Sequence, residues 1–193
     1  MSWGYVVLFV DSYTTRGIDH TCTVEKSIAE RGNILKRTFD AYGALVFLAR
    51  QPFVYPHRVA VAGSSEGGTV TLSVAETRTF DLFVNPDNLA FRAAVALYPW
   101  CIDAGAPPAI ATLILVGEFD DWTPAKDCVR MNTRWGSVGP PIELVTYPGA
   151  YHDFDVPELQ PGRKFFDHWL EYNANAADDA NRRIREFLTQ FGE

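Results

Sequence analysis

The sequence predicts an α/β fold in which a mostly parallel sheet is covered by helices on both faces. Short apolar runs alternate along the chain with segments of helical periodicity, and this order requires crossover connections between parallel strands. The 193 residues of the chain are enough for one domain with a full core. We find no internal repeat and no linker, so we expect residues 1–193 to form a single domain.

Five short apolar runs are predicted to be strands. The first, Tyr5–Val10, contains several β-branched residues, and we expect it to be buried on both faces. The other runs are RVAVA at 58–62, AAVALY at 93–98, TLILV at 112–116 and IELVTY at 142–147.

Helices are predicted between these runs. Residues 27–50 carry apolar side chains at spacings of three, four and seven, which places them on one helical face. Pro124 suits the first turn of a helix that ends near Trp135. We further expect helices over 68–76 and 177–191, loops over 52–57 and 79–88, and a helix-surface position for His168.

The composition excludes several classes of protein. The formal net charge of −7 argues against a nucleic-acid partner, because non-specific binding to nucleic acid requires a basic surface. An apolar content of 47% excludes a disordered chain. No apolar run approaches the ~20 residues that span a bilayer, and the first residues lack the basic region of a signal peptide. We therefore expect a soluble, mildly acidic domain with no membrane partner and the cytoplasm as its default location.

The three cysteines do not predict a disulfide framework. Cys22, Cys101 and Cys128 are few and dispersed, and none has metal-ligand spacing. Two interpretations stay open: buried free thiols, or one disulfide with one thiol left over. No metal site is predicted, because nothing near His152 and Asp153 completes a ligand set.

Chemistry is expected at the carboxyl ends of the strands, where open α/β sheets bind their ligands. After the second predicted strand, Gly63-Ser64-Ser65-Glu66-Gly67 fits the pattern G-x-S-x-G between a strand and a helix. The turn in this pattern is tight, so its flanking positions tolerate little more than hydrogen and the middle side chain projects above the sheet. Ser65 is therefore a candidate nucleophile.

Two further strand ends supply the groups that a serine nucleophile requires. A serine hydroxyl becomes reactive when an adjacent base takes its proton and a third group orients that base. The run GEFDDWTP at 117–124 offers Asp120 or Asp121 as the acid, and PGAYHDF at 148–154 offers His152 as the base. The order along the chain, serine first, then the acid and then the histidine, is the one expected for a G-x-S-x-G nucleophile. Spacing alone leaves the two aspartates as alternatives.

These motifs resemble the dienelactone hydrolase family of the α/β-hydrolase superfamily. The resemblance covers nearly the whole chain, in family order: GYVVLFVDSYTTRG near the start, RVAVAGSSEGG around Ser65, ALYPWC at 96–101, ILVGEFDDWTPAKDC at 114–128 and YPGAYHDF at 147–154. It implies an α/β-hydrolase fold with Ser65 as the nucleophile and His152 as the base. It favours Asp120 as the acid, because Asp120 stands four residues ahead of Pro124 as in the family pattern.

The resemblance also implies roles around the nucleophile. The backbone amide of Glu66 would donate to the oxyanion, and no metal or organic cofactor is implied. Arg16 follows the first predicted strand and would bind an anionic group of the substrate, or else be solvated or paired locally. Trp100 and Trp122 follow strand ends and either line an apolar or aromatic pocket or pack in the core.

Two departures from the family pattern bear on activity. The name-giving members carry cysteine where this chain has Ser65, and serine members resemble broader esterases. Only Met1-Ser2-Trp3 precedes the run GYVVLFVDS, which resembles a later strand of the family fold. We therefore expect an N-terminally truncated fold without the early strands and their oxyanion loop. Losing one oxyanion donor typically lowers turnover by about 10²–10³-fold, and the exposed sheet edge would favour a homo-oligomer.

Two functions follow from these observations. The first is a serine hydrolase that cleaves carboxylic ester or lactone bonds of a small-molecule substrate through a Ser-His-Asp triad. The alternative is a catalytically weak or inactive α/β-hydrolase scaffold that binds a small molecule or a partner.

Overall fold

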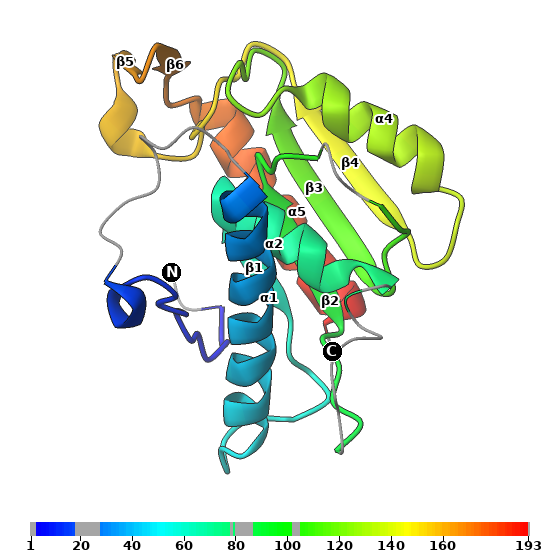
Figure 1. The fold of residues 1–193 in the computed structure, drawn as a ribbon. Coiled ribbons are helices and arrows are strands. Elements are labelled where there is room, and N and C mark those ends of the chain that lie inside the picture. The colour runs from blue at the N-terminus through cyan, green and yellow to red at the C-terminus, as the bar shows by residue number, and fades with distance from the viewer. Residues whose placement is uncertain (1–2, 18–27, 78, 80–86, 102–104, 193) are drawn as a thin grey trace.

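The computed structural model describes residues 3–17, 28–77, 79, 87–101 and 105–192. Its centre is a parallel four-stranded sheet, which confirms the predicted sheet. The strands lie in the order β1 (Val61–Ser64), β2 (Ala93–Leu97), β3 (Ala111–Gly117) and β4 (Ile142–Tyr147). Figure 1 shows them running side by side. Crossover connections join consecutive strands, so their carboxyl ends lie at one edge of the sheet.

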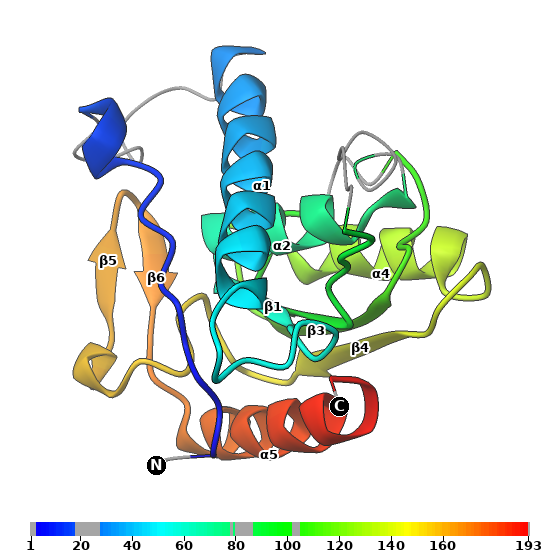
Figure 2. The same cartoon turned by 90° about the horizontal axis from the view of Figure 1, so that it is seen from below.

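Helices cover both faces of the sheet, as predicted. The α-helices of the described residues are α1 (Ile28–Ala49), α2 (Glu66–Ala75), α4 (Ala125–Trp135) and α5 (Ala174–Phe191). Figure 2 shows α1, α2 and α4 on one side of the sheet and α5 on the other. Two short 3₁₀ turns, η1 (Thr14–Arg16) and η2 (Pro157–Leu159), lie in the connections.

Strand β3 shows how one strand serves both layers. All of its residues are buried. Leu113 and Leu115 belong to the same core cluster as Phe187 of α5, whereas Ile114 clusters with Met131 of α4. Successive side chains of a strand point to opposite faces, so a strand covered on both faces requires the continuous apolar run seen here.

The prediction of a buried strand at Tyr5–Val10 is wrong. In the described part of the chain these residues pair with no strand, and their apolar side chains are exposed, Phe9 by 91%. A buried strand needs neighbours that satisfy its N–H and C=O groups and cover its side chains. Figure 2 shows this segment running outside the sheet instead.

A short antiparallel hairpin follows η2 and was not predicted. It pairs β5 (Arg163–Phe165) with β6 (His168–Leu170), and Figure 1 shows it near the carboxyl ends of β3 and β4. The interpretation of His168 as a helix-surface residue is therefore wrong, because His168 begins β6. Strands of three residues are too short to show the alternation that identifies a strand.

Of the two interpretations of the cysteines, the described residues show the disulfide. Cys101 and Cys128 form a disulfide with a Cα–Cα distance of 4.9 Å, which corrects the interpretation of free thiols. Cys22 and most of the loop expected over 79–88 lie outside the described residues. Within the part of the chain that is described, no helix is both long and apolar enough to cross a membrane.

Candidate active site

Ser65 occupies a sharp turn between β1 and α2. Its backbone φ of 52° lies in the left-handed region, which residues other than glycine rarely adopt. A Cβ atom at Gly63 would lie 2.3 Å from the carbonyl oxygen of Gly67, and one at Gly68 would lie 2.8 Å from that of Leu97, so both positions need glycine. Gly67 has open space around it. The expectation that this flanking position tolerates only hydrogen is therefore wrong, and Gly68 is the crowded one.

His152 follows β4 and is almost completely buried, with 1% of its surface exposed. Its Nε2 lies 2.9 Å from Ser65 Oγ, and its Nδ1 lies 2.7 Å from Asp120 Oδ2. Gly117 at the end of β3 allows this loop to approach, because a Cβ atom there would lie 2.4 Å from the carbonyl oxygen of Ala150. The ends of β1, β3 and β4 thus bring the three candidate residues together.

Asp120 is the carboxylate that faces the imidazole. Its Oδ1 accepts hydrogen bonds from the backbone amides of Trp122 and Thr123, at 3.0 and 2.8 Å, which fixes Oδ2 toward His152. Asp121 is exposed, and its Oδ1 lies 3.1 Å from Nδ1 of His168. Of the two aspartates, Asp120 is therefore the one whose carboxylate contacts the imidazole of His152.

Thr123 is a site residue that the sequence reasoning missed. Its hydroxyl oxygen lies 2.8 Å from Asp120 Oδ2, 3.1 Å from His152 Nδ1 and 3.0 Å from the carbonyl oxygen of Tyr98. A hydroxyl has one proton to donate, so it serves either Asp120 or Tyr98 at any moment. No spacing rule marks this threonine, which follows the acid within the same turn.

Tyr98 packs against the imidazole from the end of β2. Its ring centroid is 4.7 Å from that of His152 in an edge-on arrangement, and its φ is 37°. Its hydroxyl donates to Asp155 Oδ1 at 2.9 Å. Burial raises the pKa of the Tyr98 hydroxyl far above its usual value, so this phenol stays protonated as a donor. Burial also raises the pKa of the neighbouring Asp153.

Glu66 is the first residue of α2. Amides in the first turn of a helix have no acceptor within the helix, and the helix dipole favours negative charge there. The carboxylate of Glu66 accepts from the Tyr13 hydroxyl at 2.6 Å and forms an ion pair with Arg37 at 3.2 Å. These contacts connect the N-terminal segment and α1 to the turn that carries Ser65.

The three predicted substrate-binding side chains lie in different surroundings. Arg16 forms two hydrogen bonds with the carboxylate of Asp40, at 2.7 and 2.8 Å, as in the alternative of a locally paired arginine. These bonds hold the pKa of Asp40 below its usual value. Trp100 is half-buried, and its backbone amide donates to Thr69 Oγ1 at 2.9 Å. Trp122 contacts the candidate base directly, with its ring centroid 5.2 Å from that of His152.

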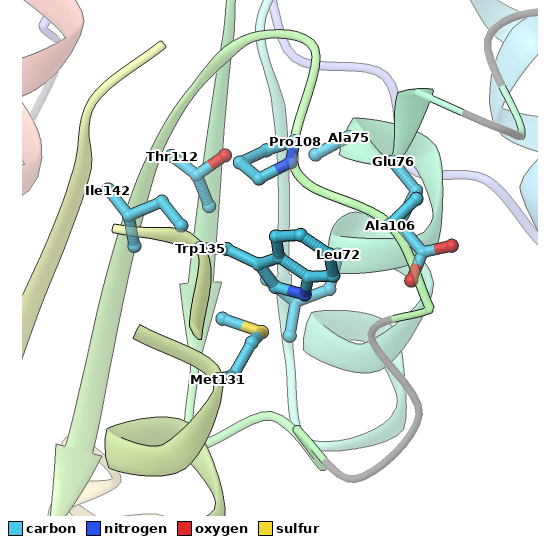
Figure 3. A pocket seen from close by; sticks show the side chains of 9 residues that line it. All are labelled: Leu72, Ala75, Glu76, Ala106, Pro108, Thr112, Met131, Trp135 and Ile142. Carbon is cyan, nitrogen blue, oxygen red and sulfur yellow. The ribbon is translucent and has the colours of Figure 1, made fainter. Parts of the chain in front are cut away.

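A small cavity lies at the opposite end of the sheet from Ser65. Its volume of about 20 Å³ is room for about one water molecule. Figure 3 shows that its lining comes from α2 and the residue that follows it, α4, the starts of β3 and β4 and the segment before β3: Leu72, Ala75, Glu76, Ala106, Pro108, Thr112, Met131, Trp135 and Ile142. Its size and place separate this cavity from the candidate nucleophile, Ser65. Among the described residues, no group of three His, Cys, Asp or Glu side chains is arranged to hold a metal ion.

Comparison with protein families gives one match over nearly the whole chain. The model of the dienelactone hydrolase family matches residues 1–192. A comparison with curated proteins finds no match.

Solved structures share the fold at low sequence identity. They include a Klebsiella pneumoniae protein assigned as a dienelactone hydrolase (20% identity, TM-score 0.59), Thermogutta terrifontis esterase 2 phosphorylated by paraoxon (18%, 0.60) and MGS-M1, an α/β-hydrolase enzyme from a Medee basin deep-sea metagenome library (18%, 0.55). The matches cover 82%, 81% and 80% of this chain but 62%, 64% and 65% of those proteins, so the chain spans less than two thirds of their length. The predicted α/β-hydrolase fold is confirmed.

Proposed function

Because the chain belongs to the dienelactone hydrolase family, we propose that it is a serine hydrolase that cleaves the carboxylic ester or lactone bond of a small molecule. Residues 1–193 act in this proposal as one α/β-hydrolase-like domain. The observation that carries it is a continuous chain of hydrogen bonds, with 2.9 Å from Ser65 Oγ to His152 Nε2 and 2.7 Å from His152 Nδ1 to Asp120 Oδ2. A serine nucleophile, its base and the orienting acid require these contacts.

In the first half of the reaction, Ser65 Oγ attacks the carbonyl carbon and its proton passes to His152 Nε2. Asp120 accepts the Nδ1–H hydrogen bond, which selects the imidazole tautomer with a lone pair on Nε2 and stabilises the imidazolium. The carbonyl oxygen becomes an oxyanion, and the Glu66 amide is its proposed donor. The tetrahedral intermediate then expels the alcohol, which takes the proton from His152, and Ser65 is left acylated.

In the second half, water replaces the alcohol. His152 takes a proton from the water as it attacks the acyl carbon, and returns it to Ser65 Oγ when the carboxylic acid leaves. With a lactone the alcohol and the acid remain parts of one molecule. Every proton transfer passes through His152 Nε2, while the Nδ1–H stays hydrogen-bonded to Asp120, so the enzyme returns to its starting state.

Hydrolysis of p-nitrophenyl acetate tests this function. We expect Ser65→Ala to lower kcat/KM at least about a thousandfold, because it removes the nucleophile. Ser64→Ala is the matched control, since it makes the same change one residue earlier and should stay within about threefold of wild type. Equal rates for Ser65→Ala and wild type would overturn the assignment.

An organophosphate probe tests the nucleophile without relying on a chosen ester. Thermogutta terrifontis esterase 2 is phosphorylated by paraoxon, and a fluorophosphonate makes the same kind of bond to an activated serine. We expect stoichiometric labelling at Ser65, located by peptide mass spectrometry, and none in His152→Ala. A folded protein that takes up no probe would instead support the inactive scaffold.

A further inference from the structure

Trp122 links the candidate base to the β5–β6 hairpin. Its ring is stacked on His168, with centroids 4.7 Å apart and planes 12° apart, and lies 5.2 Å from the His152 ring. Asp121 holds His168 through the 3.1 Å contact. The backbone of His152 also forms a parallel bridge with Leu170 of β6. The hairpin is thus tied to the base through both backbone and side chains.

The hairpin adds two further aromatic rings to this cluster. Phe165 and His168 are direct cross-strand partners, so their side chains lie on the same face of the hairpin. The Phe165 ring is 6.0 Å from Trp122 and 4.4 Å from Phe166, the latter edge-on. We call these four residues the aromatic shelf: Trp122, Phe165, Phe166 and His168.

The turn of the hairpin holds a bulky side chain in a strained backbone. Phe166 and Asp167 have φ values of 46° and 65°, where two-residue turns usually carry Asn and Gly. Burial does not account for this arrangement, because Phe166 is 48% exposed and Phe165 is 45% exposed. Backbone strain of this kind clusters at ligand-binding sites, and aromatic side chains typically line the sites of small molecules.

We propose that the aromatic shelf binds the aryl group of an aryl ester, with the ester carbonyl at Ser65. This rests on the proposed function and gives it a substrate class. A flat ring can pack offset or edge-on against the exposed rings of the shelf, whereas an alkyl group offers no ring to do so. The shelf lies within reach of the carbonyl, because Trp122 contacts His152 and His152 Nε2 is 2.9 Å from Ser65 Oγ.

Paired substrates test the shelf during turnover. We expect Phe165→Ala/Phe166→Ala to lower the ratio of kcat/KM for phenyl acetate to that for ethyl acetate by about fivefold to tenfold, the size of effect that aromatic pairs give. Phe53→Ala is the matched control, because Phe53 is 64% exposed in the loop between α1 and β1, and the ratio should not change. Phe166→Asn serves as a second variant, since Asn accepts the left-handed backbone, and a smaller fall in the same ratio is expected. A ratio equal to wild type in both shelf variants would overturn the proposal.

Binding to Ser65→Ala protein separates the shelf from the catalytic assignment. We expect calorimetric titration to show 2-naphthol binding more tightly than cyclohexanol, and the double shelf variant to weaken 2-naphthol binding about fivefold to tenfold. Shelf-dependent binding of 2-naphthol to Ser65→Ala, combined with a wild-type protein that hydrolyses neither ester, would support the shelf and contradict the hydrolase. Equal 2-naphthol affinity with and without the two phenylalanines would contradict the shelf, whatever the ester activity.

Discussion

Asp120 and Asp121 are neighbours in the chain, yet each carboxylate holds a different histidine. Asp120 Oδ2 lies 2.7 Å from Nδ1 of His152 in a buried pair, and Asp121 Oδ1 lies 3.1 Å from Nδ1 of His168 at the surface. One turn after β3 therefore supplies a carboxylate to the proposed triad and another to the hairpin beside it.

This division predicts unequal effects for the same substitution. Asp120→Asn should lower kcat by about 10³–10⁴-fold, because the amide favours the wrong imidazole tautomer. Asp121→Asn should lower it less than about tenfold, because it weakens only a contact that positions His168. Steady-state kinetics with p-nitrophenyl acetate measures both, and a larger loss in Asp121→Asn would show that the acid has been misassigned.

Thr123 is expected to act as a positioning residue for Asp120 and His152. Thr123→Val keeps the shape of the side chain but removes its hydrogen bonds, so we expect kcat to fall about tenfold while KM stays within about twofold. Thr123→Ser restores the hydroxyl and should recover most of the turnover. If valine and serine behaved alike in kcat, the hydroxyl would have no part in positioning.

The glycines around Ser65 are expected to differ in their tolerance of a methyl group. Gly63→Ala places Cβ 2.3 Å from a backbone oxygen, and overpacking of this kind costs about 1–3 kcal/mol or more. Gly67→Ala meets open space within α2, where alanine is favoured over glycine by roughly 0.5–1 kcal/mol. Urea unfolding should therefore give a lower midpoint for Gly63→Ala and an unchanged or higher one for Gly67→Ala. The opposite order would contradict the crowding at Gly63.

The Arg16–Asp40 pair is expected to contribute stability that depends on pH. The hydrogen bonds from Arg16 lower the pKa of Asp40 in the folded protein. A lowered carboxyl pKa adds stability above the unfolded value of about 3.9, and this is lost as pH falls through the folded value. Arg16→Met should thus have a lower Tm than wild type at pH 7, with a difference that shrinks below about pH 4. A difference independent of pH would show that the arginine acts through packing alone.

The sequence was sufficient to predict the sheet and its main helices, because buried residues are apolar and recur along the sequence with the spacing of a strand or a helix. The continuous apolar run of β3 indicates a strand covered on both faces, and the three-and-four spacing over 27–50 predicts a helix, although Leu35 and Phe39 of that spacing are exposed by 42% and 41%. The same rule failed at Tyr5–Val10, because an apolar run indicates a preference for burial but not whether a partner strand is present. A strand exists only through hydrogen bonds to its neighbours.

The candidate site was predictable in its residue types but not in its finer contacts. Ser65 and His152 stand at strand ends, so topology alone brings them to one edge of the sheet. The choice of Asp120 over Asp121 depends on the turn that follows it, whose backbone amides orient the Asp120 carboxylate. The contacts of the Thr123 hydroxyl with Asp120 and His152 become visible only in the folded structure. The hairpin was missed because Phe166 and Asp167 occupy a turn that usually carries Asn and Gly.

The Cys101–Cys128 bond gives the same sequence two states that differ in stability. It joins the segment after β2, which begins with Tyr98, to helix α4 across a separation of 27 residues, and a closed loop of this length stabilises a fold by about 3–4 kcal/mol in the chain-entropy model. Disulfides persist in oxidising compartments and are rare in the cytosol. The compartment in which the chain folds therefore helps to set how firmly the segment that begins with Tyr98, which packs against His152, is held in place. Expression in the periplasm or in the cytosol yields chemically different samples of one protein.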